Sequence, residues 1–311
     1  MPKNGSAESG KLCNRLEELI LNFEQELKSE NLRNKVLSLI PLFHTLRDLG
    51  ESLIPAQFAA SARDRILFYF RRYPYTVING DELLVVSAIQ EYARRVRELR
   101  VQFGWAIISG KTMKEMASEG ELPVSNFEIS KMKPNDYILL SKEQDKEAAF
   151  RWAVANETRK KKESVRSKLL EYFRLNVEKP VTGEELRYVA NDKTEWARRV
   201  RELRTEFGWP ITTKSTGRPD LPVGTYVLEA LRQSPEHDRQ IPDPVRAAVL
   251  RRDGYKCAKC SWSHTGWNAS DPRHLEIHHL IEHAMGGQNI EENLMTVCTV
   301  CHDDIHRKKK Q

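Results

Sequence analysis

Residues 275–306 read LEIHHLIEHAMGGQNIEENLMTVCTVCHDDIH, and this stretch decides the fold of the C-terminal part of the chain. It joins two neighbouring histidines, His278 and His279, to a CxxC pair that is followed by His302 and His306. Histidines four residues apart on a helix project from one face, so they can share a metal ion. Adjacent residues of a strand point to opposite sides, so only one of the two neighbouring histidines could face that ion.

Four of the five cysteines form two CxxC pairs, Cys257 with Cys260 and Cys298 with Cys301. Two such pairs chelate one tetrahedral ion, and four thiolates leave no coordination position for substrate. We therefore expect a structural zinc ion that holds together a domain with a small core. Cys13 stands alone and is expected to be an ordinary thiol.

The region from about 241 to 306 resembles the HNH, or ββα-metal, nuclease family. It carries the features of that family in order: the lead-in VRAAVLRRDGYKCAKC, the His278-His279 pair, Gly286-Gly287, Asn293-Leu294, and the closing Cys298-x-x-Cys301-His302-x-x-x-His306. So many features in register make the resemblance specific.

The resemblance implies a role for each of five residues. His278, His302 and His306 would bind a catalytic divalent ion, with Mg²⁺ or Mn²⁺ expected and other transition metals open. His279 would be the general base, since an imidazole with a pKa near neutrality is suited to activating water. Asn293 would hold the loop between the strands by backbone hydrogen bonds and orient the base. The implied reaction hydrolyses a phosphodiester and leaves 5′-phosphate and 3′-hydroxyl ends.

An internal repeat dominates the middle of the chain. Residues 92–105 read YARRVRELRVQFGW, and residues 196–209 read WARRVRELRTEFGW. Around each copy, the pattern predicts an apolar helix, a glycine turn, a short helix, an amphipathic helix and two strands joined by a polar loop. Three helices followed by a hairpin resemble a winged-helix domain, whose third helix enters the major groove of DNA.

The arginines of the repeated helix allow two interpretations. They could form a solvated basic face paired with Glu98 and Glu202, or they could anchor DNA phosphates beside base contacts at the helix start. We favour DNA binding because two copies precede a nuclease-like domain. The candidate DNA-binding residues are Tyr92, Arg94, Arg95, Lys193, Trp196, Arg198 and Arg199. The two aromatic residues could contact a methyl group on DNA, but they fit equally well as core residues.

The expected fold class is a multidomain α+β protein. Its parts are a helical segment at 1–60, winged-helix-like repeats at 61–141 and 164–232, a charged connector at 142–163, a proline-rich linker at 233–244 and the zinc-stapled HNH domain at 245–311. The net charge of +6 favours a polyanionic partner. The N-terminal stretch has no apolar core of a secretion signal, and no apolar run approaches the roughly 18 residues of a membrane span. We therefore expect a cytoplasmic protein with no membrane partner.

These expectations combine into a site-specific DNA endonuclease of the restriction type, with dependence on base modification left open. A DNA-binding regulator with an inactive nuclease domain and a relatively nonspecific nuclease of a defence system or mobile element are the alternatives. The intact histidine set argues against the first, and the duplicated reader argues against the second. The expected partner is double-stranded DNA. A homodimer formed through the N-terminal helices is a further hypothesis, because one active site cuts one strand at a time. His264, His274 and His283 lie outside the pattern and are expected on the surface.

Overall fold

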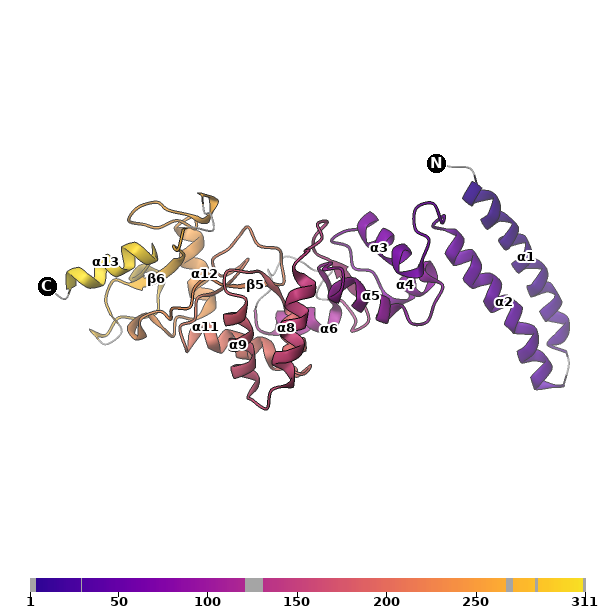
Figure 1. Cartoon of the computed structure of the whole chain (residues 1–311), viewed down its shortest axis with the longest axis horizontal. Coiled ribbons are helices and arrows are strands. Elements are labelled where there is room, and N and C mark those ends of the chain that lie inside the picture. The colour runs from indigo at the N-terminus through magenta and orange to yellow at the C-terminus, as the bar shows by residue number, and fades with distance from the viewer. Residues whose placement is uncertain (1–3, 29, 121–130, 267–270, 283–284, 310–311) are drawn as a thin grey trace. The chain divides into compact units, whose positions relative to one another are not determined.

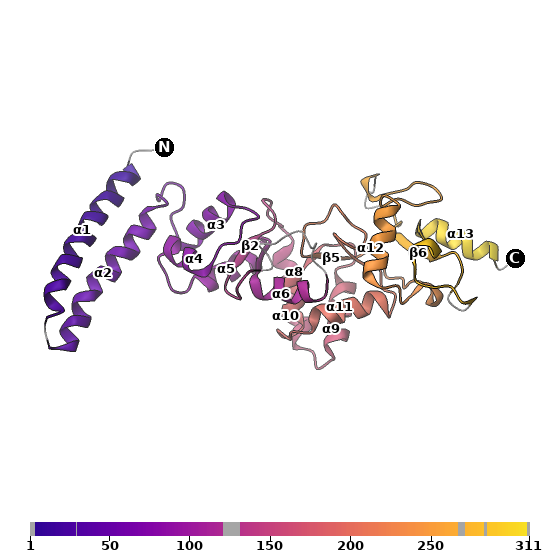
Figure 2. The ribbon, with the colours of Figure 1, turned by 180° about the vertical axis from the view of Figure 1, so that it is seen from behind.

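The structure is a computed structural model, and it describes residues 4–28, 30–120, 131–266, 271–282 and 285–309. The described residues form helices and short antiparallel strands, and five helices precede the first strand (Figure 1, Figure 2). The chain divides into two compact units, which are residues 1–110 with 133–149 and residues 111–132 with 150–311. None of the described helices has the length and apolar composition that a membrane crossing requires.

The chain begins with a helical hairpin, in which α1 (Asn4–Glu26) and α2 (Leu32–Ser52) lie side by side (Figure 1, Figure 2). Asn31 caps the second helix, because its side chain accepts a hydrogen bond from the Asn34 N–H at 3.2 Å. Several large apolar side chains of the hairpin are exposed: Ile20, Leu21, Leu27, Leu32, Val36, Leu37, Ile40, Phe43 and Leu46. Its apolar surface is therefore only partly covered within one chain.

The first repeat has the predicted order of helices and strands. Its elements are α3 (Ala62–Arg72), α4 (Gly80–Ser87), α5 (Tyr92–Val101), β1 (Ile107–Ser109) and β2 (Tyr137–Leu139). The two strands are antiparallel, and Ile78 makes an isolated bridge to Tyr137. One apolar core joins the helices to the strands and contains Ile66, Phe70, Leu83, Val96, Leu99, Ile107 and Leu139.

The second repeat has the same order and one additional strand. Its elements are α9 (Val165–Leu175), β3 (Val181–Thr182), α10 (Gly183–Val189), α11 (Trp196–Thr205), β4 (Ile211–Thr213) and β5 (Thr225–Leu228). The short β3 was not predicted, and the antiparallel sheet has the order β3-β5-β4. Two helices lie in segments predicted as polar loop and charged connector, namely α6 (Gly110–Ser118) and α8 (Ala148–Lys160).

The second helix of each repeat begins with the same capping box. Asn79 and Thr182 each accept a hydrogen bond from the backbone N–H three residues later. The glutamates at those positions, Glu82 and Glu185, accept in return from the N–H of the capping residue. The duplicated sequence therefore sets the same helix start twice, because each box satisfies backbone donors that a helix end leaves unpaired.

The C-terminal domain is built on a strand–strand–helix unit. Its elements are the 3-10 helix η1 (Glu236–Asp238), α12 (Asp243–Arg252), η2 (His264–Gly266), β6 (Leu275–His279), η4 (Glu291–Asn293), β7 (Leu294–Cys298) and α13 (Thr299–Lys309). The two strands are antiparallel, with Leu275 opposite Cys298 and His279 opposite Leu294. Their buried side chains join the helix α12 in one core, which includes Ile241, Val249, Leu250, Ile277 and Val297.

The two CxxC pairs meet in this domain. Their four Sγ atoms lie within 4.8 Å of one another, and those of Cys260 and Cys298 are 3.7 Å apart. Two sulfurs bound to one tetrahedral zinc at about 2.3 Å would be roughly 3.8 Å apart. Burial opposes ionisation of Cys257, but backbone hydrogen bonds from Cys298, Cys260 and Lys259 lower its thiol pKa to about 7. The spacing of the four sulfurs fits a zinc ion.

Loss of one of these cysteines is expected to unfold the C-terminal domain, because the free energy of zinc binding is part of its folding free energy. Cys298→Ala should remove one zinc ion per chain and abolish the thermal transition of the domain. Cys13→Ala, which changes an exposed thiol on α1, should change neither. Metal analysis and calorimetry test this expectation, and a Cys298→Ala protein that retained its zinc and its transition would contradict it.

Candidate active site

Three histidines converge from a strand and a helix. His278 comes from β6, and His302 and His306 lie on successive turns of α13. The Nε2 atom of His302 lies 3.2 Å from His278 Nδ1 and 3.0 Å from His306 Nε2. The structure thus brings together the three side chains that the sequence predicted as ligands of a catalytic ion.

A fourth side chain, Asp238, reaches the same point and was not predicted. It belongs to η1, in the segment 233–244 that was expected to be a linker. Its Oδ2 atom lies 2.7 Å from His302 Nε2, 3.3 Å from His306 Nε2 and 3.4 Å from His278 Nδ1. The donor atoms of all four residues lie within 4.8 Å of one another, so they form one candidate metal site.

Glu276 fixes the orientation of His302. The Nδ1–H of His302 donates to Glu276 Oε2 at 2.6 Å, which turns Nε2 towards the cluster. Burial opposes protonation, but hydrogen bonds to Asp238 and Glu276 raise the pKa of His302 to about 9. The surroundings therefore stabilise positive charge at this point. A carboxylate–histidine pair of this kind is the usual support of a metal-binding imidazole, so the donor set fits a divalent ion.

His279, the predicted general base, lies against the cluster with its side chain fully buried. Its Nδ1 lies 2.9 Å from Asp238 Oδ1, and its backbone N–H donates to the same oxygen at 3.1 Å. Its Nε2 lies 2.8 Å from Oδ1 of Asn289, whose Nδ2 donates to the carbonyl of Gln240. Asp238 thus contacts the base through one oxygen and the histidine cluster through the other.

Asn293 holds the loop between the two strands. Its Nδ2 donates to the carbonyls of Ile281 and Gln288, each at 3.0 Å, and its Oδ1 accepts from the Ile281 N–H at 2.9 Å. A Cβ atom on Gly287 would lie 1.9 Å from the Ile281 carbonyl oxygen, so glycine is required there. These contacts match the loop-holding role that the family resemblance implies for the asparagine.

The remaining histidines of the domain differ from the expectation of surface positions. His274 is only 2% exposed, with its Nε2 3.4 Å from Glu276 Oε1. The side chain of His264 is largely buried and packs edge-on against Trp262. Both rings therefore lie in the packed interior, His274 beside Glu276 and His264 beside Trp262. His283 lies outside the described residues.

The arginines of the repeated helices form the same pairs in both copies. Arg95 contacts Glu98 at 2.6 Å, and Arg199 makes the equivalent contact at 2.8 Å. Arg94 and Arg198, at the preceding position, have side chains that are 69% and 54% exposed. The predicted Arg–Glu pairing is therefore present, and Arg94 and Arg198 still extend into solvent.

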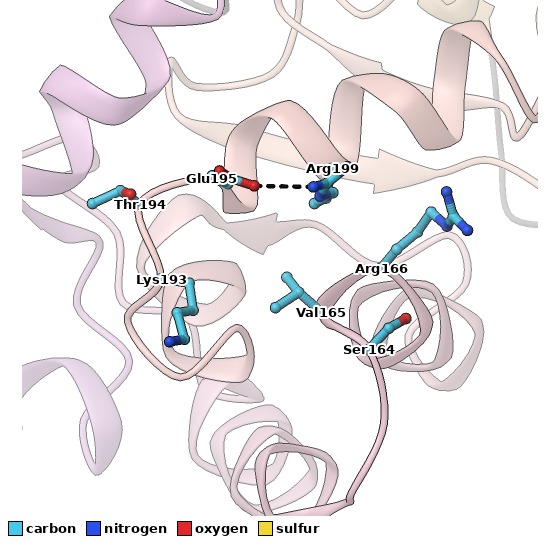
Figure 3. A pocket seen from close by; sticks show the side chains of 7 residues that line it. All are labelled: Ser164, Val165, Arg166, Lys193, Thr194, Glu195 and Arg199. Carbon is cyan, nitrogen blue, oxygen red and sulfur yellow. Dashed lines mark hydrogen bonds and ion pairs between the residues drawn. The ribbon is translucent and has the colours of Figure 1, made fainter.

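Lys193 and Arg199 line a pocket in the second repeat. It has a volume of about 520 Å³ and is lined by Ser164, Val165, Arg166, Lys193, Thr194, Glu195 and Arg199 (Figure 3). The carboxylate of Glu195 pairs with Arg199 at 3.0 Å, as Figure 3 shows. The pocket lies where α9 and α11 begin, and helix N-termini together with basic side chains attract anions.

The two aromatic candidates for DNA binding lie in the interior. Trp196 is 0% exposed, and its Nε1–H donates to Glu115 Oε2 at 2.7 Å. Tyr92 is partly buried and packs against the apolar core of the first repeat. Both residues therefore pack as core aromatics, which was the alternative interpretation. The buried indole of Trp196 has no exposed surface that could contact DNA.

Two family models match the chain. The model described as the KpnI N-terminal domain matches residues 63–140 and 166–229, which correspond to the two repeats. The model described as HNH endonuclease matches residues 257–308, which include the cysteines and the three clustered histidines. No curated protein and no solved structure matches the chain significantly. The chain therefore carries a C-terminal HNH endonuclease domain behind a duplicated KpnI-type region, and because KpnI is a restriction enzyme, this combination is consistent with an HNH endonuclease of restriction type.

Proposed function

We propose that this protein is a site-specific DNA endonuclease in which the two repeats read DNA and the HNH domain cuts it. One observation carries the proposal. In the segment that the HNH model matches, the three candidate metal-ligand histidines lie close together, and His279 lies beside them. The duplicated KpnI-type region favours recognition of a site over nonspecific cutting.

His278, His302 and His306 would hold a divalent ion. When bound, such an ion stabilises negative charge on the scissile phosphate and on the leaving 3′ oxygen. Imidazole nitrogens bind transition metals better than Mg²⁺, which prefers oxygen ligands. Of the two ions expected from the sequence, Mn²⁺ is therefore the better match to this donor set.

His279 would act on the attacking water. With Nδ1 facing Asp238, the neutral ring would accept a proton from water at Nε2 once Asn289 Oδ1, which is itself an acceptor, has moved away from that nitrogen. The water oxygen attacks phosphorus, the bond from phosphorus to the 3′ oxygen breaks, and 5′-phosphate and 3′-hydroxyl ends result. Asn289 lies over Nε2 and would give up this contact to the water, while Asn293 keeps the loop in place.

Replacement of the base is expected to abolish cleavage without abolishing DNA binding. His279→Ala should lower the rate by about 10²–10⁴-fold, the usual contribution of a general base. His44→Ala, which changes an exposed histidine on α2, should cut at the normal rate. The assay uses Mn²⁺ and plasmids from methylating and non-methylating hosts, with fragments separated on gels.

Discrete fragments support a site-specific enzyme, and a difference between the plasmids would reveal dependence on modification. Equal cutting by His279→Ala and the wild-type protein would exclude this mechanism.

For DNA reading, we propose that each repeat is a winged-helix-like domain with α5 or α11 as its recognition helix. The helix order and the β3-β5-β4 sheet support this interpretation. Exposed Arg94 and Arg198 would contact phosphates, as would Arg95, Lys193 and Arg199 nearby. We assign no side chain to base contacts, because Trp196, the aromatic candidate of the second repeat, is buried.

Removal of the two exposed arginines is expected to weaken DNA binding in a salt-dependent way. Arg94→Ala combined with Arg198→Ala should reduce the slope of log K against log salt by about 2, since each phosphate contact contributes about 0.9. The control combines Arg47→Ala with Lys160→Ala, which removes two exposed, ion-paired charges outside the repeated helices. Fluorescence anisotropy at several salt concentrations measures both. Equal slopes in the two double variants would place these arginines outside the interface.

We also propose that the N-terminal hairpin binds the hairpin of a second copy. Val36, Ile40 and Phe43 follow helical spacing on α2 and are exposed. The helix α1 carries five acidic and two basic residues, whereas α2 carries two acidic and three basic residues. A two-fold arrangement that places α1 against the partner's α2 would bury the apolar stripe and bring opposite charges together. It would also supply the second active site that a double-strand break requires.

A charge on this stripe is expected to separate the dimer. The wild-type protein should sediment with twice the 36.0 kDa mass of one chain, and Phe43→Asp should sediment as a monomer. Phe150→Asp is the matched control, because Phe150 is as exposed but lies outside the hairpin. A wild-type protein that stays monomeric at micromolar concentration would remove this proposal.

A further inference from the structure

Asp238 lies outside both segments that the family models match, yet its side chain is completely buried in the HNH site. It is the last residue of η1, and its backbone N–H donates to the Pro235 carbonyl at 3.0 Å. Two residues later, the N–H of Gln240 donates to the carbonyl of Thr205 at 2.7 Å. The next residue, Ile241, is fully buried in the core of the domain. Backbone hydrogen bonds at Asp238 and Gln240 and the burial of Ile241 thus fix the backbone that carries the Asp238 carboxylate.

Four ligand atoms converge at one point of the cluster. The Nε2 atom of His302 lies 2.7 Å from Asp238 Oδ2, while its Nδ1 lies 2.6 Å from Glu276 Oε2. Nδ1 of His278 and Nε2 of His306 lie 3.4 and 3.3 Å from the same Asp238 oxygen. All four atoms lie within 4.8 Å of one another, so one metal ion could contact them together.

The other oxygen has a different partner. Oδ1 accepts from the backbone N–H of His279 at 3.1 Å and lies 2.9 Å from its Nδ1, which fixes the position of the ring. In catalytic sites, a buried carboxylate on Nδ1 holds an imidazole in the tautomer whose Nε2 can accept a proton. One carboxylate therefore connects the predicted metal site to the predicted base.

We propose that Asp238 is the fourth protein ligand of the catalytic ion through Oδ2 and the positioning residue of His279 through Oδ1. The inference rests on the proposed function, since it concerns the same site. His278, His302, His306 and Asp238 would hold the ion together, and when bound it would stabilise negative charge on the scissile phosphate.

The ligand role is tested by Mn²⁺ binding to the full-length, zinc-loaded protein without DNA. Asp238→Asn keeps the size of the side chain and removes its charge, and it should weaken Mn²⁺ binding by at least about tenfold. Glu236→Gln, at an exposed position in the same 3-10 helix, should bind Mn²⁺ like the wild-type protein. Electron paramagnetic resonance of free Mn²⁺ gives the affinities, and zinc content confirms that each variant is folded. Unchanged affinity in folded Asp238→Asn would overturn the ligand role.

The positioning role is tested by cleavage at saturating Mn²⁺, where the site is filled in both proteins. Asp238→Asn should then keep a kcat about 10–100-fold below that of the wild-type enzyme, because its base is no longer held by a charged acceptor. Full recovery of kcat with excess Mn²⁺ would overturn this role. A wild-type protein that binds Mn²⁺ through Asp238 but cuts no DNA would refute the proposed function and leave the ligand assignment standing.

Discussion

The register of β6 on β7 is the constraint on which the C-terminal site depends. Leu275 pairs with Cys298, and the Thr299 N–H continues the pairing to the carbonyl of His274 at 3.1 Å. The Ala258 N–H donates to the Thr296 carbonyl at 2.8 Å, which attaches the first CxxC turn to the same strand. A slip of one residue would turn every side chain to the opposite face. The four clustered cysteines and the clustered histidines would then separate together, so one hairpin positions both candidate metal sites of the domain.

The repeats preserve a scaffold in which aromatic residues serve packing. The guanidinium of Arg63 lies 4.5 Å from the ring centroid of Phe103, and that of Arg166 lies 4.5 Å from that of Phe207. The glycine after each phenylalanine has a positive φ, of +66° and +69°, which favours glycine. The FGW run that identifies the repeat therefore secures the end of the third helix against the first. Duplication kept these internal contacts and left the exposed surface free to differ between copies.

Features with fixed spacing could be predicted from the sequence. The HNH domain is confirmed by its family model, and the paired CxxC motifs do meet. Helix order in the repeats followed from the periodicity of apolar residues. Asp238 could not be found this way, because a single acid in the segment QSPEHDRQIPDP has no spacing relation to the histidines. The sequence left open whether Trp196 contacts DNA or lies in the core, since its partner Glu115 comes from a helix 81 residues earlier, in a segment predicted as loop.

The segment between the second repeat and the HNH domain is bonded to the second repeat and contributes a buried carboxylate to the HNH domain. Neither contact would be made by a flexible linker. Its prolines restrict the backbone, and its Gln240 N–H is bonded to the end of α11 at Thr205. Within two residues of that bond, Asp238 is buried among four histidines. A carboxylate in such surroundings needs positive charge beside it, because burial of an uncompensated charge costs several kcal/mol. The connection between the second repeat and the HNH domain is therefore fixed at Gln240 and Asp238, because the same segment contributes Asp238 to the candidate metal site.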